Sequence, residues 1–226
     1  MKNLAIMLVA VAVVVMAAPA HAVLLWEENF DGTVGDSIVS TGNWVSTDSA
    51  ILINATTIDA GNSGAEPAGG AWANAFSTVI DHTLAANEPG FRYSWVMADP
   101  DGHSGYQALY ARATSGNANS WYMQYTAGGS QNIMLNAPNG DILWEDASPP
   151  NAKVVVETSV AGGTSLWVNG DFKIHDPAIG LDHVHNIVVT MEGGYFDSIK
   201  LEIIPEPSTI GLLAIGGMLT MLRRRR

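Results

Sequence analysis

Two histidines late in the chain have a spacing that metal ligands can have. His183 and His185 stand two residues apart, so a β-strand would carry both imidazoles on one face. Two imidazoles on one face can begin a zinc site. Asp176 and Asp182 lie near in sequence, but no third ligand follows at a recognisable spacing, and a polar strand edge is the simpler explanation. Three further histidines fall in predicted turns without an evident partner: His82, His103 and His175.

Carboxylates arranged for hydrolysis are not evident. Glycoside hydrolysis needs two carboxyl groups placed about the scissile bond. The nearest arrangement is Asp141 and Glu145, which share a face if their segment is a strand, although a turn beside a short strand explains it better. The sequence has no G-x-S-x-G, H-E-x-x-H or phosphate-loop motif, and no cysteine for thiol catalysis or thiolate zinc binding. We therefore predict that the protein is not an enzyme.

Aromatic side chains offer a binding chemistry instead. All seven tryptophans follow residue 22, and flat sugar rings stack on exposed aromatic faces. In a strand over 121–126, Trp121 and Tyr125 share one face, while Tyr122 and Gln124 share the other. One face must meet the core. We expect Trp121 and Tyr125 to bind ligand, and the alternative is that these rings belong to the core.

The composition of residues 23–204 indicates one domain with its own core. Residues 23–206 carry five basic and 22 acidic side chains, a net charge of −17. Such a surface repels nucleic acid and anionic lipid, and it suits the capture of divalent cations. Without cysteine the domain must be held together by its core, or by its core and a metal.

The first 22 residues have the layout of a secretory signal peptide. Lys2 is followed by an apolar run, and Ala20-His21-Ala22 forms an A-x-A cleavage site marked by Ala20 and Ala22. The apolar run is short for a membrane span. We therefore expect export and removal of residues 1–22, with an uncleaved anchor as the alternative.

The last 22 residues read PEPSTIGLLAIGGMLTMLRRRR. Pro205, Glu206 and Pro207 end the last strand, because proline lacks an N–H and fixes φ. The apolar segment that follows has 13 residues, against about 20 for a stable span. The closing arginines act as a membrane stop by the positive-inside effect: Arg223, Arg224, Arg225 and Arg226.

This tail resembles the PEP-CTERM sorting signal of Gram-negative bacteria. The resemblance implies that an exosortase-type enzyme recognises Pro205, Glu206 and Pro207 after transient anchoring in the inner membrane. It also implies a destination at the cell surface or in the exopolysaccharide matrix. The alternative is an ordinary C-terminal membrane anchor.

Many short apolar runs separated by turn residues indicate an all-β fold, an antiparallel β-sandwich of the jelly-roll type. We expect it to be flanked by the N-terminal signal helix and a short C-terminal hydrophobic helix. Asn169-Gly170 predicts a type I′ turn, and the break in alternation between Phe196 and Ile199 predicts a bulge. The expected strands are 24–30, 38–45, 50–54, 76–81, 91–97, 106–112, 121–126, 133–135, 142–144, 153–160, 164–168, 172–174, 185–191 and 195–204.

Three segments of this domain resemble concanavalin-A-like, laminin-G-like jelly rolls: LWEENFDG at 25–32, SLWVNG at 165–170 and YFDSIKL at 195–201. The resemblance implies that the first and last strands lie side by side. It also implies a structural calcium ion held by Glu28, Asp31 and Asp197, unless these residues simply occupy turns and edges. The Glu-x-Asp-x-(x)-Glu run of the β-glucan-cleaving relatives is missing, which puts hydrolysis in doubt.

Together these features predict an exported, non-catalytic surface or matrix protein that binds extracellular polysaccharide. One alternative is a structural matrix protein without a specific ligand. Another is a divergent glycan hydrolase or lyase.

Overall fold

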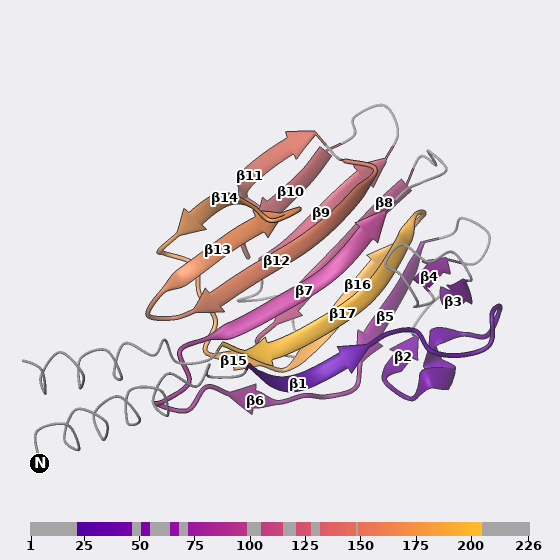
Figure 1. Cartoon of the computed structure of the whole chain (residues 1–226), viewed down its shortest axis with the longest axis horizontal. Helices are drawn as coiled ribbons and strands as arrows, with labels where there is room; N and C mark the ends of the chain where they lie inside the picture. Colours follow the sequence, from indigo (N-terminus) through magenta and orange to yellow (C-terminus); the bar gives the residue numbers. More distant parts are fainter. Residues whose placement is uncertain are drawn as a thin grey trace, which may run out of the picture.

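The computed structural model describes residues 22–46, 51–54, 64–67, 72–98, 105–114, 121–127, 132–147 and 149–204. In these ranges the chain forms two antiparallel sheets that pack face to face, with one small ribbon beside them (Figure 1). The expectation of an all-β antiparallel sandwich is confirmed. The expected signal helix and C-terminal helix lie outside the described residues, and no helix within them is long and apolar enough to cross a membrane.

One sheet has eight strands and is drawn nearest the viewer in Figure 1. β17 (Tyr195–Ile203) pairs on one side with β7 (Phe91–Ala98), and on the other with β1 (Val23–Glu28) and β4 (Gly64–Pro67). The remaining strands extend the sheet outward from these: β12 (Asn151–Ser159), β13 (Gly163–Val168) and β14 (Asp171–Asp176) beyond β7, and β3 (Ile51–Asn54) beyond β4. The first and last strands therefore lie side by side, as the resemblance implied.

The other sheet has seven strands and lies behind the first. In order across the sheet they are β11 (Ile142–Ala147), β10 (Asn132–Asn136), β9 (Trp121–Ala127), β8 (Gly105–Arg112), β16 (Asn186–Met191), β5 (Ala73–Ser77) and β2 (Trp44–Ser46). A separate two-stranded ribbon joins β6 (His82–Thr83) to β15 (His183–Val184).

The core lies between the two sheets and is rich in aromatic rings. Trp95 of β7 stacks on Trp121 of β9 at 6.3 Å between ring centroids, and Tyr93 meets the edge of the same indole at 5.0 Å. All three side chains are buried. Such aromatic pairs add to the free energy gained by burying their area, and here they join one sheet to the other.

Two predicted backbone features are confirmed. Asn169 and Gly170 both have positive φ, 53° and 84°, as a type I′ turn requires, and they connect β13 to β14. The register of β17 against β7 shifts between Asp197 and Lys200, and Ser198 has a φ of 49°. This is the predicted bulge.

The segment 38–45 was expected to be one strand, and the structure corrects this. Ile38–Thr41 forms a 3₁₀ helix, η1, and only then does β2 begin at Trp44. Ser37 caps η1 through the Val39 amide, and Gly42 ends it in the left-handed region at a φ of 82°. Apolar composition suggested a strand, but the two capping residues decide the local structure.

Candidate functional site

Strand alternation gives the outer face of the seven-stranded sheet a row of aromatic rings. On β8 and β9, Tyr110 and Tyr122 are directly paired and both point away from the core. Their rings stack at 4.9 Å with an interplanar angle of 23°. Tyr106, four residues before Tyr110 on the same face of β8, places its hydroxyl 3.0 Å from that of Tyr110.

Trp72 extends this row toward the start of β5. Its indole lies 4.9 Å from the ring of Tyr106, and it is 51% exposed. The four rings of Trp72, Tyr106, Tyr110 and Tyr122 form a continuous series that we call the aromatic ladder. A large exposed indole at the end of such a series presents a flat apolar face to solvent.

A groove of about 510 Å³ lies against the ladder. Its walls include polar groups as well as rings. Thr190 of β16 donates to the Oδ1 atom of Asn74 on β5 at 2.7 Å, and the Arg112 guanidinium lies 5.4 Å from the centroid of Phe76. The residues lining it are Trp72, Asn74, Phe76, Tyr110, Arg112, Val188 and Thr190.

The electrostatics of the groove follow from partial burial. Burial raises the pKa of Tyr106 and of Tyr122, so both phenols stay neutral at physiological pH. Burial also lowers the pKa of Arg112, whose side chain packs against Phe76. The site therefore combines flat rings, neutral hydroxyl and amide groups and one cation, a set able to hold a hydroxyl-rich ligand.

Trp121 and Tyr125, the two residues expected to bind ligand, lie on the opposite face of β9. Trp121 is fully buried, and Tyr125 is 3% exposed with its hydroxyl donating to the Pro149 carbonyl at 2.8 Å. Neither ring can present its face to a ligand, which corrects that expectation. The sequence held a usable signal, because Trp121, Met123 and Tyr125 form the more apolar of the two faces and so belong inside.

The three expected calcium ligands are not brought together. Glu28 is buried, and its carboxylate accepts hydrogen bonds from the Phe30 amide, the Thr41 hydroxyl, Asn43 and the Trp44 indole, at 2.6–3.2 Å. Among the described residues, these carboxylates form no cluster with ligand atoms within 4.8 Å of one another. The Glu28 carboxylate is thus occupied by hydrogen bonds from the protein itself.

The other two carboxylates have different surroundings. Asp197 is fully buried beside the β17 bulge and accepts from the Ser198 hydroxyl at 3.0 Å, whereas Asp31 is exposed. Side-by-side placement of the first and last strands is therefore not sufficient to assemble a calcium site at these residues.

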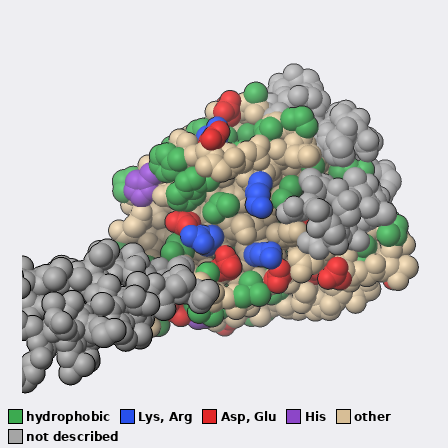
Figure 2. Space-filling model, viewed as in Figure 1, with side chains coloured by type: hydrophobic (Ala, Val, Ile, Leu, Met, Phe, Trp, Pro, Cys, Tyr) green, Lys and Arg blue, Asp and Glu red, His purple; other side chains and the backbone are tan. Residues whose placement is uncertain are grey.

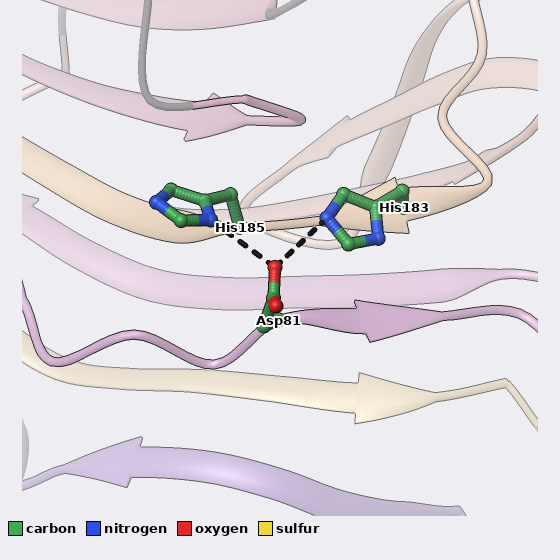
Figure 3. Close-up of side chains that lie close together, drawn as sticks. All are labelled: Asp81, His183 and His185. Atoms are coloured by element: carbon green, nitrogen blue, oxygen red, sulfur yellow. Dashed lines mark hydrogen bonds and ion pairs between the residues drawn. The ribbon is translucent and has the colours of Figure 1, made fainter.

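The histidine pair gains a third partner that the sequence did not reveal. Asp81, just before β6, lies 3.3 Å from His183 Nε2 and 3.2 Å from His185 Nδ1 through its Oδ1 atom (Figure 3). The hydrogen bond with His185 lowers the pKa of the Asp81 carboxyl. No local spacing pattern could have identified Asp81, because it precedes the histidines by about a hundred residues.

The remaining polar candidates have ordinary partners. Asp141 lies in the turn before β11 and accepts from Asn139 at 2.6 Å, and Glu145 on β11 accepts from Asn132. His82 pairs with Glu88 at 3.0 Å, and His175 with the Ser165 hydroxyl at 2.9 Å. His103 lies outside the described residues.

Comparison with known proteins identifies one part of the sequence. Residues 204–226 match the family model of the PEP-CTERM protein-sorting motif. The chain carries a PEP-CTERM sorting motif. The PEP residues, the arginine cluster and the expected signal cleavage site all lie outside the described residues: Pro205, Glu206, Pro207, Arg223, Arg224, Arg225, Arg226, Ala20 and Ala22.

Several solved structures share the fold of this protein at low sequence identity. The globular domain of T. cruzi calreticulin has a TM-score of 0.58 at 10% identity, over 90% of this chain and 100% of that one. A protein of unknown function with a galectin-like fold from Bacillus subtilis has a TM-score of 0.53 at 10% identity, over 82% and 98%.

A third similar structure was solved with a sugar. Domain 4 of AbnA, a GH43 extracellular arabinanase from Geobacillus stearothermophilus in complex with arabinotriose, has a TM-score of 0.52 at 14% identity. The match covers 84% of this chain and 97% of that domain. No curated protein matches the sequence. These similarities establish the lectin-like jelly-roll fold. They do not establish the function, which must be argued from the site.

Proposed function

We propose that this PEP-CTERM protein is exported, processed by an exosortase-type enzyme and held at the bacterial cell envelope or in its extracellular matrix. The matched sorting motif supports this, together with the signal-peptide pattern of residues 1–22. In this proposal Pro205, Glu206 and Pro207 are the recognition residues, and Arg223–226 stop the chain transiently in the inner membrane.

The sorting proposal is tested by intact mass of protein recovered from the envelope and medium. The expected product lacks residues 1–22 and the segment after the Pro-Glu-Pro sequence. Changing Pro205, Glu206 and Pro207 together to alanine should leave export intact and retain the uncleaved tail. Normal processing of that variant would overturn the role given to these three residues.

We further propose that the domain binds carbohydrate, non-catalytically, in the groove beside the aromatic ladder. The observation that carries this is the exposed Trp72 indole at the end of the aromatic ladder, next to the hydroxyl and amide groups of Thr190 and Asn74. The apolar face of a sugar ring packs on an aromatic face while its hydroxyls bond to neighbouring polar groups. The similar domain solved with arabinotriose supports the same class of ligand.

The lining of the groove supports a binding role over a hydrolytic one. Among the described residues, its lining includes one cation and no carboxylate. Hydrolysis of a glycosidic bond by the usual route requires two carboxyl groups flanking that bond. Asp141 and Glu145 are both exposed and bonded to asparagines, and neither lines the groove.

Affinity electrophoresis in gels containing arabinan, a β-glucan or exopolysaccharide from the producing cells tests this proposal. We expect at least one polysaccharide to retard the wild-type protein, and Trp72→Ala to abolish most of the retardation. Phe172→Ala is the matched control, since Phe172 is 58% exposed but lies on the other sheet. Equal loss in both variants, or no retardation of the wild type by any of the three, would favour a structural matrix protein without a specific ligand.

A further inference from the structure

The residues Asp81, His183 and His185 meet at the two-stranded ribbon (Figure 3), and none of the three lines the groove. The backbone fixes this meeting. The amides of Ile80 and Asp81 both donate to the His185 carbonyl, at 2.9 and 3.2 Å, and β6 pairs with β15 through Thr83 opposite His183. The three side chains are therefore held by main-chain hydrogen bonds on both strands of the ribbon.

From this arrangement we propose that Asp81, His183 and His185 bind a zinc-class transition-metal ion. Zinc takes nitrogen and carboxylate ligands at about 2.0–2.2 Å, so two ligands of a tetrahedral ion lie about 3.4 Å apart. Asp81 Oδ1 lies 3.3 Å from His183 Nε2 and 3.2 Å from His185 Nδ1, and all three ligand atoms lie within 4.8 Å of one another.

The same distances are slightly longer than those of a close ion pair. Charge-assisted N–H···O bonds are usually about 2.7–2.9 Å long, shorter than either distance here. Both imidazoles also direct a nitrogen at one carboxylate oxygen, as Figure 3 shows. Two imidazole nitrogens thus converge on one carboxylate oxygen at about the spacing between zinc ligands.

A neighbouring hydroxyl orients one of the two rings. Thr83 Oγ1 lies 2.8 Å from His183 Nδ1, on the side of the ring away from the Nε2 atom that faces Asp81. Metal-binding histidines usually hold a hydrogen-bond partner on the nitrogen that does not bind the metal, which fixes the ring and its tautomer. Thr83 supplies that second contact from the paired strand.

The types of ligand atom determine which class of metal ion the site suits. Two imidazole nitrogens and one carboxylate suit zinc and its neighbours, whereas calcium requires six to eight oxygen ligands. The side chains of His183 and His185 are 27% and 25% exposed and that of Asp81 is 63% exposed, so the site is open to solvent. Water can therefore complete the coordination.

The bound ion would tie two distant parts of the chain together. Asp81 precedes β7, and the histidines precede β16, with about a hundred residues between them. The chain has no cysteine with which to make such a link covalently. An ion bound only by the folded state stabilises that state, and the gain in free energy rises with the free ion concentration relative to the Kd.

The test uses the untagged exported protein, stripped with EDTA and then titrated with zinc chloride by isothermal titration calorimetry. We expect one saturable zinc per chain and a rise in melting temperature that EDTA reverses. Calcium chloride at the same concentrations should produce neither effect. Absence of a one-to-one zinc event would overturn the proposal.

Variants assign the ligands. His183→Ala, His185→Ala and Asp81→Asn should each weaken zinc binding at least about tenfold and abolish the zinc-dependent rise in melting temperature. Asn suits position 81 because it tolerates the positive φ of 51° found there. His175→Ala is the matched control, since His175 lies on β14 and contacts Ser165. Retention of wild-type affinity in all three variants, with folding verified in EDTA, would also overturn the assignment.

Discussion

The two outer faces of the sandwich differ in the chemistry that they present. The face of the seven-stranded sheet carries the aromatic ladder and its groove. The face of the eight-stranded sheet carries lysines and arginines among acidic side chains, as Figure 2 shows. There Arg92 pairs with Glu157 across β7 and β12, and Lys200 with Glu27 across β17 and β1, both at 2.6 Å.

This difference arises from the residues that each strand carries at its outward-facing positions. Both sheets bury alternate residues in the same core, and β9 and β12 share the same two-residue period. Outward positions near the middle of the eight-stranded sheet carry ion pairs, with an aromatic pair of Trp167 and Phe172 toward its edge. Outward positions of the seven-stranded sheet carry the aromatic ladder. The same strand period thus gives the two faces different surface chemistry.

The largest expected effect is on stability, and it distinguishes the inner from the outer face of β9. Trp121→Ala should lower the free energy of unfolding by about 3–5 kcal/mol, because it opens a cavity against Trp95 and Tyr93. Tyr122→Ala, one residue along, should cost much less stability and weaken polysaccharide binding. Urea unfolding and affinity electrophoresis of both variants measure this contrast. Similar losses of stability would contradict the assignment of inner and outer faces.

The next effect concerns the edge where the two sheets are joined. Glu28 of β1 accepts from the Trp44 indole on β2, so one carboxylate links the two sheets. Glu28→Gln replaces one acceptor oxygen by a donor and should lower stability by about 2 kcal/mol, since buried hydrogen bonds to a charged acceptor are lost. Urea unfolding measures this loss of stability, and Glu27→Gln on the outer face of the same strand serves as the control. An unchanged midpoint for Glu28→Gln would show that this link is dispensable.

A smaller effect is expected on the charged face. Arg92→Ala removes the partner of Glu157, but both side chains are partly exposed and the pair is screened by solvent. The free energy of unfolding should fall by less than about 1 kcal/mol, with polysaccharide binding unchanged. A loss of retardation in the polysaccharide gel would move the binding site to this face.

The smallest effect expected is that of salt on binding. Stacking on neutral rings does not depend on ionic strength, so raising NaCl from about 0.05 to 0.5 M should change retardation less than about twofold. A steep loss of binding in salt would indicate that Arg112 binds a charged sugar, which would narrow the ligand to acidic polysaccharides. Titrations of wild type and Arg112→Gln distinguish these results.

Much of the architecture could be predicted because the period of a strand is local. Alternation identified most strands, the Asn169-Gly170 turn and the β17 bulge. The short strands β4, β6 and β15 were not found, since segments such as Gly64–Pro67 have no apolar alternation. β4 pairs with β3 and β17, and β6 and β15 pair with each other, so these strands are defined by partners distant in sequence.

The sites were harder to predict because they depend on which face turns inward and on contacts between distant segments. Trp121 and Tyr125 were placed on the correct strand; the more apolar character of their face indicated burial, and packing against the other sheet confirms it. Asp81 could not be linked to His183 from the sequence, since the pairing of β6 with β15 brings them together.

The pairing of β1 with β17 also has a mechanical consequence. Val23 lies opposite Ile203, so the chain enters and leaves the sandwich at the same pole. A pull on the end of β17 acts along a strand bonded to β7 on one side and β1 on the other, and it loads those hydrogen bonds in shear, many at once. A domain tethered beyond residue 204 and dragged by a bound polysaccharide would therefore resist flow as a unit, without opening strand by strand.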